Sequence, residues 1–256
     1  MISFFSRPLR LVALVAVIGV AGGAYWLWSG AHTSTAADQN TALAEFREKA
    51  IPATPAKPGV PASGVYRYRA TGSESAGSGV LSASRPLPAE AVYIITPREG
   101  GYHEDLRLSE EHVEEADFAV GERGTSATWR RTKVMFLGIG TDDRDDVQPP
   151  SFDHPSKLSV GKTWAGSYRL GELKVDYTGK VTGRDTVQLD GKSVPVFVIR
   201  TDSTFTGATP GTRTDEIRWS PALSLPVAWS IDQKTGGDAE FSISADLALV
   251  SGTPQR

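Results

Sequence analysis

The stretch Gly161-Lys162-Thr163 matches the end of the phosphate-binding loop found in many nucleotide-binding proteins. That loop also needs an earlier glycine, and Ser156 occupies its position. It must follow a strand and open a helix, whereas here the alternating segment WAGSYRL comes next. The sequence therefore predicts a turn at Gly161 and no nucleotide binding.

The segment HEDLR begins like the helical motif of zinc proteases, in which two histidines hold the metal. Arg107 stands where the second histidine is needed, so a ligand is missing. His103 is one of four histidines in the chain, and a three-ligand zinc site is therefore not expected.

Four carboxylates, those of Asp142, Asp143, Asp145 and Asp146, follow one another closely, and calcium prefers oxygen ligands of this kind. Their spacing matches no EF-hand loop, and Arg144 lies between them. A solvated loop is the favoured interpretation, with weak calcium binding as the alternative.

The chain contains no Gly-x-Ser-x-Gly motif, and its sequence shows no nucleophile beside a base. We expect no enzyme activity, no catalytic residues, no cofactor and no metal. The ligand-binding residues are unknown from sequence.

Composition excludes further classes of function. The 256 residues carry a formal net charge of −3, so the chain offers no basic field for nucleic acid. It contains no cysteine, which excludes disulfides, thiol catalysis and thiolate zinc sites.

Residues 11–28 form an uncharged and mostly apolar run. As a helix this run spans about 27 Å, close to the roughly 30 Å of a bilayer's hydrocarbon core. Arg7 and Arg10 precede it, so residues 1–10 are expected to be cytoplasmic and the rest of the chain extracytoplasmic. The sequence predicts a single-pass signal anchor in the cell membrane. The alternative is a signal peptide cleaved after Ala31, which would leave a secreted protein.

Residues 29–63 are predicted to be a stalk. The segment DQNTALAEFREKA suits a short amphipathic helix with Leu43, Phe46 and Ala50 on one side. Four prolines follow in IPATPAKPGVPAS, which is typical of a semi-rigid spacer.

Residues 64–252 show apolar side chains with a period of two, which predicts antiparallel strands that cover one core. Tyr66, Tyr68 and Ala70 share one face of the first such segment. Asp190-Gly191 lies between two alternating runs and predicts a hairpin turn. The segment SEEHVEEADFAV is ambiguous, since it suits a short helix or a polar edge strand.

The segment RTDEIRWSPALSLPVAWS contains two strand patterns separated by a break between Pro221 and Pro226. Proline cannot donate a ladder hydrogen bond, so a bend is expected there, with Leu223 and Leu225 against the sheet. The tryptophans of these strands, Trp219 and Trp229, are interpreted as core residues, with a ligand cavity as the alternative.

The strand ending WSPALSLPV, together with GVYRYRATGSE, PPSFDHPSKLSVGKTW and VTGRDTVQLDGKSVPVFVIRTDST, resembles uncharacterised actinobacterial membrane-anchored or secreted proteins. They are distantly similar to DUF3108-type domains and to the half-barrel envelope domains of lipoprotein carriers such as LolA and LppX. The resemblance spans residues 64–250. It implies a single antiparallel, strongly curved sheet, either a half-barrel or an open barrel, with little helix. Relatives often carry cysteines, and this chain has none.

The sequence thus predicts a mainly β, non-catalytic extracytoplasmic domain of the cell envelope, anchored in the membrane by residues 11–28. The leading hypothesis is that the concavity of the sheet binds a lipid or another apolar ligand. The alternative is a protein-interaction or assembly module of the envelope, and an extracytoplasmic hydrolase is a third hypothesis.

Overall fold

The computed structural model of the chain describes residues 34–49, 51–78, 81–136, 139–237 and 239–256. They form one helix, α2 (Gln39–Glu48), and a mainly β body. The strands are β1 (Gly64–Ser78), β2 (Leu81–Pro86), β3 (Glu90–Arg98), β4 (Gly101–Arg107), β5 (His112–Gly121), β6 (Gly124–Phe136), β7 (Ile139–Pro155), β8 (Thr163–Leu170), β9 (Leu173–Leu189), β10 (Lys192–Thr206), β11 (Gly211–Ser220), β12 (Leu225–Thr235) and β13 (Glu240–Leu249).

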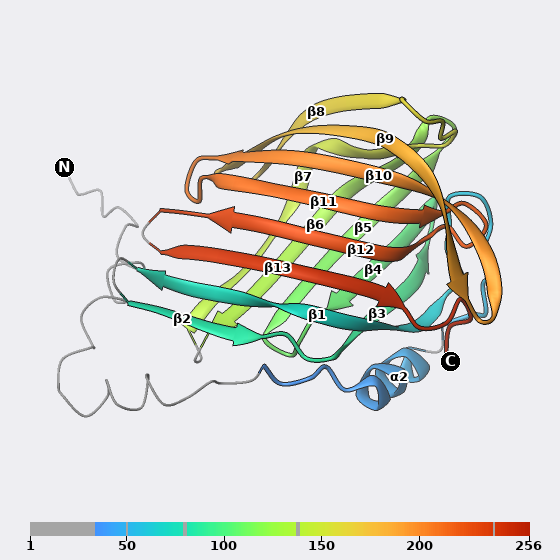
Figure 1. The fold of residues 1–256 in the computed structure, drawn as a ribbon, viewed down its shortest axis with the longest axis horizontal. Helices are drawn as coiled ribbons and strands as arrows, with labels where there is room; N and C mark the ends of the chain where they lie inside the picture. The colour runs from blue at the N-terminus through green and yellow to red at the C-terminus, as the bar shows by residue number, and fades with distance from the viewer. Residues whose placement is uncertain (1–33, 50, 79–80, 137–138, 238) are drawn as a thin grey trace, which may run out of the picture. The chain divides into compact units, whose positions relative to one another are not determined.

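The strands form one antiparallel sheet that closes into a barrel (Figure 1). Strands from β3 to β13 each lie beside the next, and β1 pairs with both β3 and β13. The closing ladder runs from Tyr68, opposite Leu249, to Gly77, opposite Glu240. The prediction of an antiparallel β fold is confirmed. The expected half-barrel or open barrel is wrong, because this ladder joins the two ends of the sheet.

β2 is an extra strand outside the twelve-stranded ring. The first half of β1 pairs with β3, from Gly64 to Arg69, and its second half pairs with β2, from Ser73 to Ser78. β1 therefore pairs with both β3 and β2 along one of its edges and with β13 along the other.

Alternation along the strands separates the lumen of the barrel from its outer face. Tyr66, Tyr68 and Ala70 are buried in the main core, as the sequence predicts. Their cross-strand neighbours on β13 are apolar too; Leu247, for example, lies opposite Ala70. Burial of these side chains contributes the free energy that holds the ring together.

Both turns predicted from the sequence are present. Asp190 and Gly191 have positive φ angles of 52° and 70° and join β9 to β10. Residues 221–224 form the turn between β11 and β12. Leu225 at its end is buried, and Leu223 packs against the same core, as expected.

The helix α2 packs on the outside of the barrel. Its Ala42, Leu43 and Phe46 form a cluster with Val65 of β1 and residues of β3. Asp38 caps the helix by accepting hydrogen bonds from the backbone of Asn40 and Thr41. The amphipathic helix expected in this segment is present, with its apolar side turned to the sheet.

The proline-rich segment also lies against the barrel, and the stalk role of residues 29–63 stays a prediction. Val60 belongs to the main core. Ser224 fixes the segment from the β11–β12 turn: its hydroxyl donates to the carbonyl of Lys57 at 3.0 Å and accepts from the N–H of Gly59 at 3.1 Å. The prolines stiffen the segment, and Val60 anchors it to the core.

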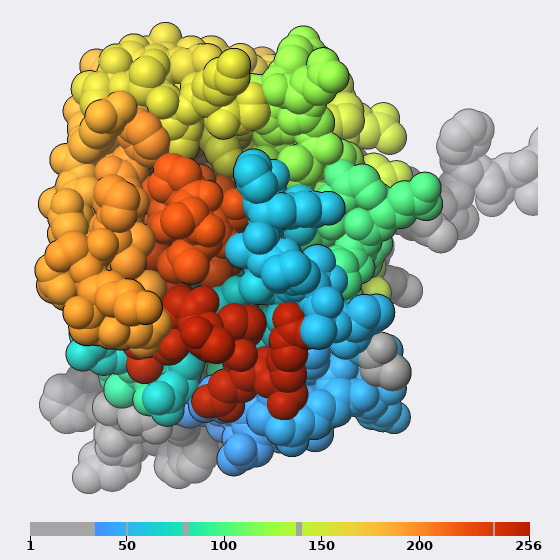
Figure 2. Space-filling model, turned by 90° about the vertical axis from the view of Figure 1, so that its right-hand side faces the viewer, coloured from blue at the N-terminus to red at the C-terminus, as the bar shows by residue number. Residues whose placement is uncertain are grey.

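One end of the barrel is covered by three segments that are far apart in the sequence. Figure 2 shows there the residues before β1 in light blue, the C-terminal residues in red and the β9–β10 hairpin in orange. The backbone of Val65 pairs with Gln255, and Asp190 accepts a hydrogen bond from the N–H of Gly252 at 2.8 Å. These bonds link the segments across that end.

The ambiguous segment SEEHVEEADFAV forms β5, a strand paired on both sides, with β4 and β6. It is neither a helix nor an edge strand, because its polar residues His112 and Glu114 face charged partners in the lumen.

No helix among the described residues has the length and apolar character needed to cross a membrane. The predicted anchor, residues 11–28, lies outside the described residues, as does the proposed cleavage site at Ala31.

We predict that Phe46→Ala lowers the free energy of unfolding by about 3–5 kcal/mol, because it leaves a cavity between α2 and the sheet. Urea unfolding followed by tryptophan fluorescence measures this change. The matched control is Glu48→Ala on the exposed side of the same helix, which is expected to stay within about 0.5 kcal/mol of the wild type. Equal effects of the two changes would contradict the packing described.

Candidate functional site

The barrel wall is weakest between β7 and β8. These strands share a single ladder pair, Gln148 with Arg169, whereas β8 and β9 are paired from end to end. Pro149 and Pro150 follow directly on β7 and have no N–H to donate. We call the facing segments, residues 149–155 of β7 and 163–168 of β8, the seam.

A tyrosine from β9 reaches across β8 to hold the seam. The backbone N–H of Phe152 on β7 donates to the hydroxyl of Tyr177 at 2.9 Å. This path is open because residue 166 on β8 is a glycine. A Cβ there would lie 2.4 Å from the Tyr177 hydroxyl, so any side chain would displace it. The missing strand-to-strand bond is thus replaced by one side chain.

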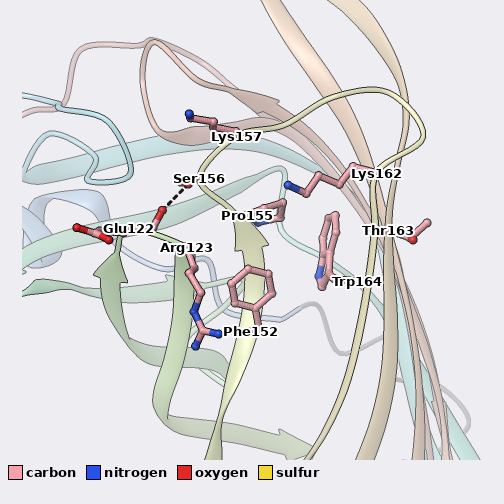
Figure 3. A pocket seen from close by; sticks show the side chains of 9 residues that line it. All are labelled: Glu122, Arg123, Phe152, Pro155, Ser156, Lys157, Lys162, Thr163 and Trp164. Carbon is pink, nitrogen blue, oxygen red and sulfur yellow. Dashed lines mark hydrogen bonds between the residues drawn. The ribbon is translucent and has the colours of Figure 1, made fainter.

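A cleft of about 510 Å³ lies at the end of the seam next to the β7–β8 loop (Figure 3). Its walls come from β7, the β7–β8 loop, the start of β8 and the β5–β6 turn. The lining residues are Glu122, Arg123, Phe152, Pro155, Ser156, Lys157, Lys162, Thr163 and Trp164. The Ser156 hydroxyl donates to the carbonyl of Glu122 at 2.7 Å and joins the loop to the β5–β6 turn. We call this hollow the seam cleft.

The seam cleft combines positive charge with aromatic surface. Arg123, Lys157 and Lys162 contribute three cations, against one carboxylate from Glu122. Figure 3 shows the Glu122 carboxylate pointing away from Lys162 and Trp164. The site can therefore attract a negatively charged group and also offers flat apolar walls.

Trp164 is the central aromatic residue of this region. Its ring lies over Gly179 on β9, where a Cβ would come within 2.2 Å of it. Its indole Nε1 is buried and has no hydrogen-bond partner among the described residues. The same side chain also lines a second hollow, of about 430 Å³, over β8, β9 and β10. Unsatisfied buried donors are uncommon, and this N–H is one of the few among the described residues.

The lumen contains a chain of charged side chains at the end of the barrel where β5 and β11 begin. Arg213 of β11 contacts Glu114 of β5, with Nη1 and Oε1 2.9 Å apart. These strands lie six places apart in the sheet, so their side chains meet only across the lumen. Arg213 also binds Asp215, which accepts a hydrogen bond from the Trp229 indole at 2.9 Å.

The charged chain continues from Glu114 through His112 to β1 and β2. His112 Nε2 lies 3.5 Å from Glu114, and its Nδ1 lies 2.8 Å from Glu74. Glu74 accepts a hydrogen bond from Arg85 Nε at 2.7 Å. Arg85 Nη2 lies 2.6 Å from the same carboxylate oxygen, but its N–H groups do not point at that oxygen, so this contact is an ion pair only. We call the set from Arg85 to Asp215 the lumen charge chain.

Partners in the lumen charge chain shift its pKa values. Burial lowers the pKa of His112, but Glu114 and Glu74 outweigh burial and raise it to about 8. Burial raises the pKa of Glu114, and Arg213 and His112 reverse this and hold it well below the usual range. Glu74 shows the same balance, with a lowered pKa despite burial. His112 therefore carries its proton at neutral pH.

Motifs singled out from the sequence lie apart from one another. Gly161 forms a turn with φ of 86°, as predicted for the Gly-Lys-Thr stretch, while Lys162 lines the seam cleft. His103 lies on strand β4, not on a helix, and its Nδ1 is 2.7 Å from Asp117. Asp142 on β7 pairs with Arg131 at 2.6 Å. Among the described residues, no group of three or more potential ligands is arranged to hold a metal ion.

Sequence reasoning missed the seam cleft and the lumen charge chain. The adjacent prolines at 149 and 150 were an available signal for an interrupted ladder. The charge chain had no local signal, because Glu114 and Arg213 are 99 residues apart.

Comparison with known proteins gives no assignment: no protein-family model, no curated protein and no solved structure matches the chain.

Removing Arg213 tests the lumen charge chain. Arg213→Met leaves Glu114 and Asp215 without their cation and is expected to cost about 3–5 kcal/mol of unfolding free energy. The control is Arg200→Met, which breaks an exposed pair with Asp202 on the outer face. It is expected to cost less than about 1 kcal/mol in the same urea titration. A small effect of Arg213→Met would show that the cation does not bridge the lumen.

The pH dependence of stability follows from the same groups. His112 has a raised pKa, so its stabilisation is complete below pH 6.5 and is lost as pH rises through about 8. Glu114 has a lowered pKa, so its stabilisation is present above pH 4.5 and is lost as pH falls. These two groups together are therefore expected to stabilise the fold most between pH 4.5 and 6.5.

Urea unfolding at a series of pH values measures this profile. Between pH 6.5 and 8 the expected loss from His112 is on the order of 2 kcal/mol. Burial raises the pKa of Glu104 to about 7, so its contribution to stability is lost as pH rises from about 4.5 through 7, which overlaps the start of the loss from His112. In the double variant His112→Gln, Glu104→Gln, the free energy of unfolding is expected to change little as pH rises to 8. A wild-type free energy of unfolding that does not fall as pH rises to 8 would contradict the raised pKa values.

Proposed function

We propose that this chain is a non-catalytic extracytoplasmic binding domain whose seam cleft takes an anionic amphiphile, a lipid-like molecule with a phosphate or carboxylate head. One observation carries the proposal: three cations and two aromatic rings line the same open cleft. The anchoring of the domain by residues 11–28 and its location in the cell envelope stay predictions from the sequence.

The cleft suggests how such a ligand is oriented. Lys157 and Lys162 both come from the β7–β8 loop, next to the barrel wall, and are suited to the negative head. Phe152 and Trp164 lie deeper along the seam and are suited to the apolar part (Figure 3).

The cleft is a better place for the ligand than the lumen. The lumen is crossed by the Arg213–Glu114 ion pair, and the apolar side chains of the main core line it. An apolar chain placed there would have to displace ion pairs, which is costly in a low-dielectric interior. The proposal therefore moves the lipid-binding hypothesis from the concavity of the sheet to its seam.

A protein partner is the second candidate function. The seam edge of β8 has one ladder bond to β7, so most of its backbone groups are not paired with that strand. Such an edge favours the addition of an extended peptide from another protein. An envelope assembly module would use this edge, and a hydrolase has no comparable support.

Hexyl phosphate is a suitable probe, since it is water-soluble and carries both a head and a short tail. Isothermal titration of the full chain in a neutral detergent is expected to show binding. Lys162→Met and Trp164→Ala are each expected to weaken it about tenfold or more, which is about 1.4 kcal/mol. Hexanol and inorganic phosphate test the tail and the head separately, and each is expected to bind more weakly.

Controls separate binding from folding. Lys192→Met removes an exposed lysine at the β9–β10 hairpin, far along the chain from the cleft, and is expected to leave the affinity unchanged. Trp164→Phe keeps an aromatic wall and is expected to bind better than Trp164→Ala. Binding that is unaffected by Lys162→Met, or no binding of hexyl phosphate at all, would contradict the proposal.

A further inference from the structure

Arg130 differs from the other arginines that face the lumen. Arg85 and Arg213 each pair with carboxylates at short distances. Arg130 forms no ion pair with any residue in the described part of the chain, and its Nε is buried without a hydrogen-bond partner. Leaving a buried N–H of a cation without a partner costs free energy, so its retention calls for an explanation.

The register of β6 places Arg130 on the inner face of the barrel. It lies opposite Ala116 of β5, which is buried in the main core. Earlier on β6, a bulge at Thr128 places Ala127 on the same inner face, opposite Phe118. Arg130 nevertheless retains some exposed surface, as does Tyr168 on β8, so the lumen is not completely filled beside it.

Acidic groups near Arg130 are already engaged. Asp153 lies 2.6 Å from Nδ1 of His154. Glu104 accepts a hydrogen bond from the hydroxyl of Tyr93, and burial raises its pKa to about 7, so much of it is uncharged at neutral pH. Burial opposes the charge of Arg130, yet Tyr168, Asp153 and Glu104 keep its pKa raised, so the guanidinium stays a cation.

The surroundings of Arg130 are aromatic. Its Cζ lies 6.0 Å from the centre of the Phe118 ring, and Phe118 stacks on Tyr102 with ring centres 5.1 Å apart. A guanidinium offers a planar fork of donors that matches a carboxylate, while aromatic walls accept a small organic body.

We infer that the lumen beside Arg130 is a binding site for a small organic carboxylate, whose two oxygens pair with the guanidinium. This site does not rest on the seam cleft: its residues come from the inner faces of β4, β5, β6 and β8. The bound anion supplies the direct ion-pair partner that Arg130 does not have among the described residues.

Trifluoroacetate is the probe, observed by ¹⁹F NMR with the full chain in a neutral detergent. Its signal is expected to broaden and shift with the wild type, and acetate is expected to compete. Arg130→Met is expected to abolish the effect. Arg130→Lys, which keeps the charge without the fork, is expected to weaken it about tenfold. Trifluoroethanol, a neutral compound of similar size, is expected to show no shift.

Thermal unfolding separates a binding role from a structural one. Acetate is expected to raise the melting temperature of the wild type and to leave that of Arg130→Met unchanged. In acetate-free buffer Arg130→Met is expected to be at least as stable as the wild type, because it removes a half-buried charge that has no ion-pair partner among the described residues. A purely structural arginine would give the opposite order, which would overturn the inference.

Two further comparisons make the result specific. If chloride at the same concentration stabilises the wild type as much as acetate, the carboxylate assignment is overturned. If Lys162→Met abolishes the trifluoroacetate effect while Arg130→Met does not, the anion sits in the seam cleft. That result would overturn the inference but leave the proposed function standing. Arg130→Met is expected to bind hexyl phosphate as the wild type does, because the seam cleft is a separate site.

Discussion

Closure of the sheet through the β1–β13 ladder is the constraint on which the rest of the structure depends. A ring of eight strands encloses a lumen that side chains can just fill, and a ring of twelve is wider. In this wider ring, some apolar side chains that point inward are too short to contact those of the opposite wall. Long charged side chains span the remaining distance, and the Arg213–Glu114 pair does so between β11 and β5. The lumen charge chain is thus a consequence of ring size.

The same closure creates the seam. Every strand in a closed ring needs partners on both edges, yet two prolines on β7 remove donors where β8 should pair. The Tyr177 hydroxyl compensates at one backbone N–H, through the space left by Gly166. What remains is an opening lined by cations and aromatic rings, and this is where both the ligand hypothesis and the partner hypothesis locate function.

Local features of the fold were predictable from the sequence, because local chemistry determines them. Asp190-Gly191 specifies a tight turn, and the alternation of Tyr66, Tyr68 and Ala70 specifies an inward face. Closure was not predictable, since it depends on pairing between residues such as Ser75 and Ser242, which are 167 positions apart. β5 was ambiguous because His112 and Glu114 point inward to charged partners that the sequence does not reveal. The seam cleft had one local sign, Pro149-Pro150, whereas its cations are scattered over a turn and a loop.

A disulfide across the closing ladder tests the central claim most directly. Ser75 and Ser242 face each other on β1 and β13 with their hydroxyl oxygens 2.8 Å apart, and the natural chain has no cysteine. In the double variant Ser75→Cys, Ser242→Cys, a closed barrel is expected to form an intramolecular disulfide quantitatively under mild oxidation, seen as the loss of two thiols by mass spectrometry of the intact chain. An open half-barrel would leave both thiols free or crosslink separate chains, and either result would contradict the closed ring.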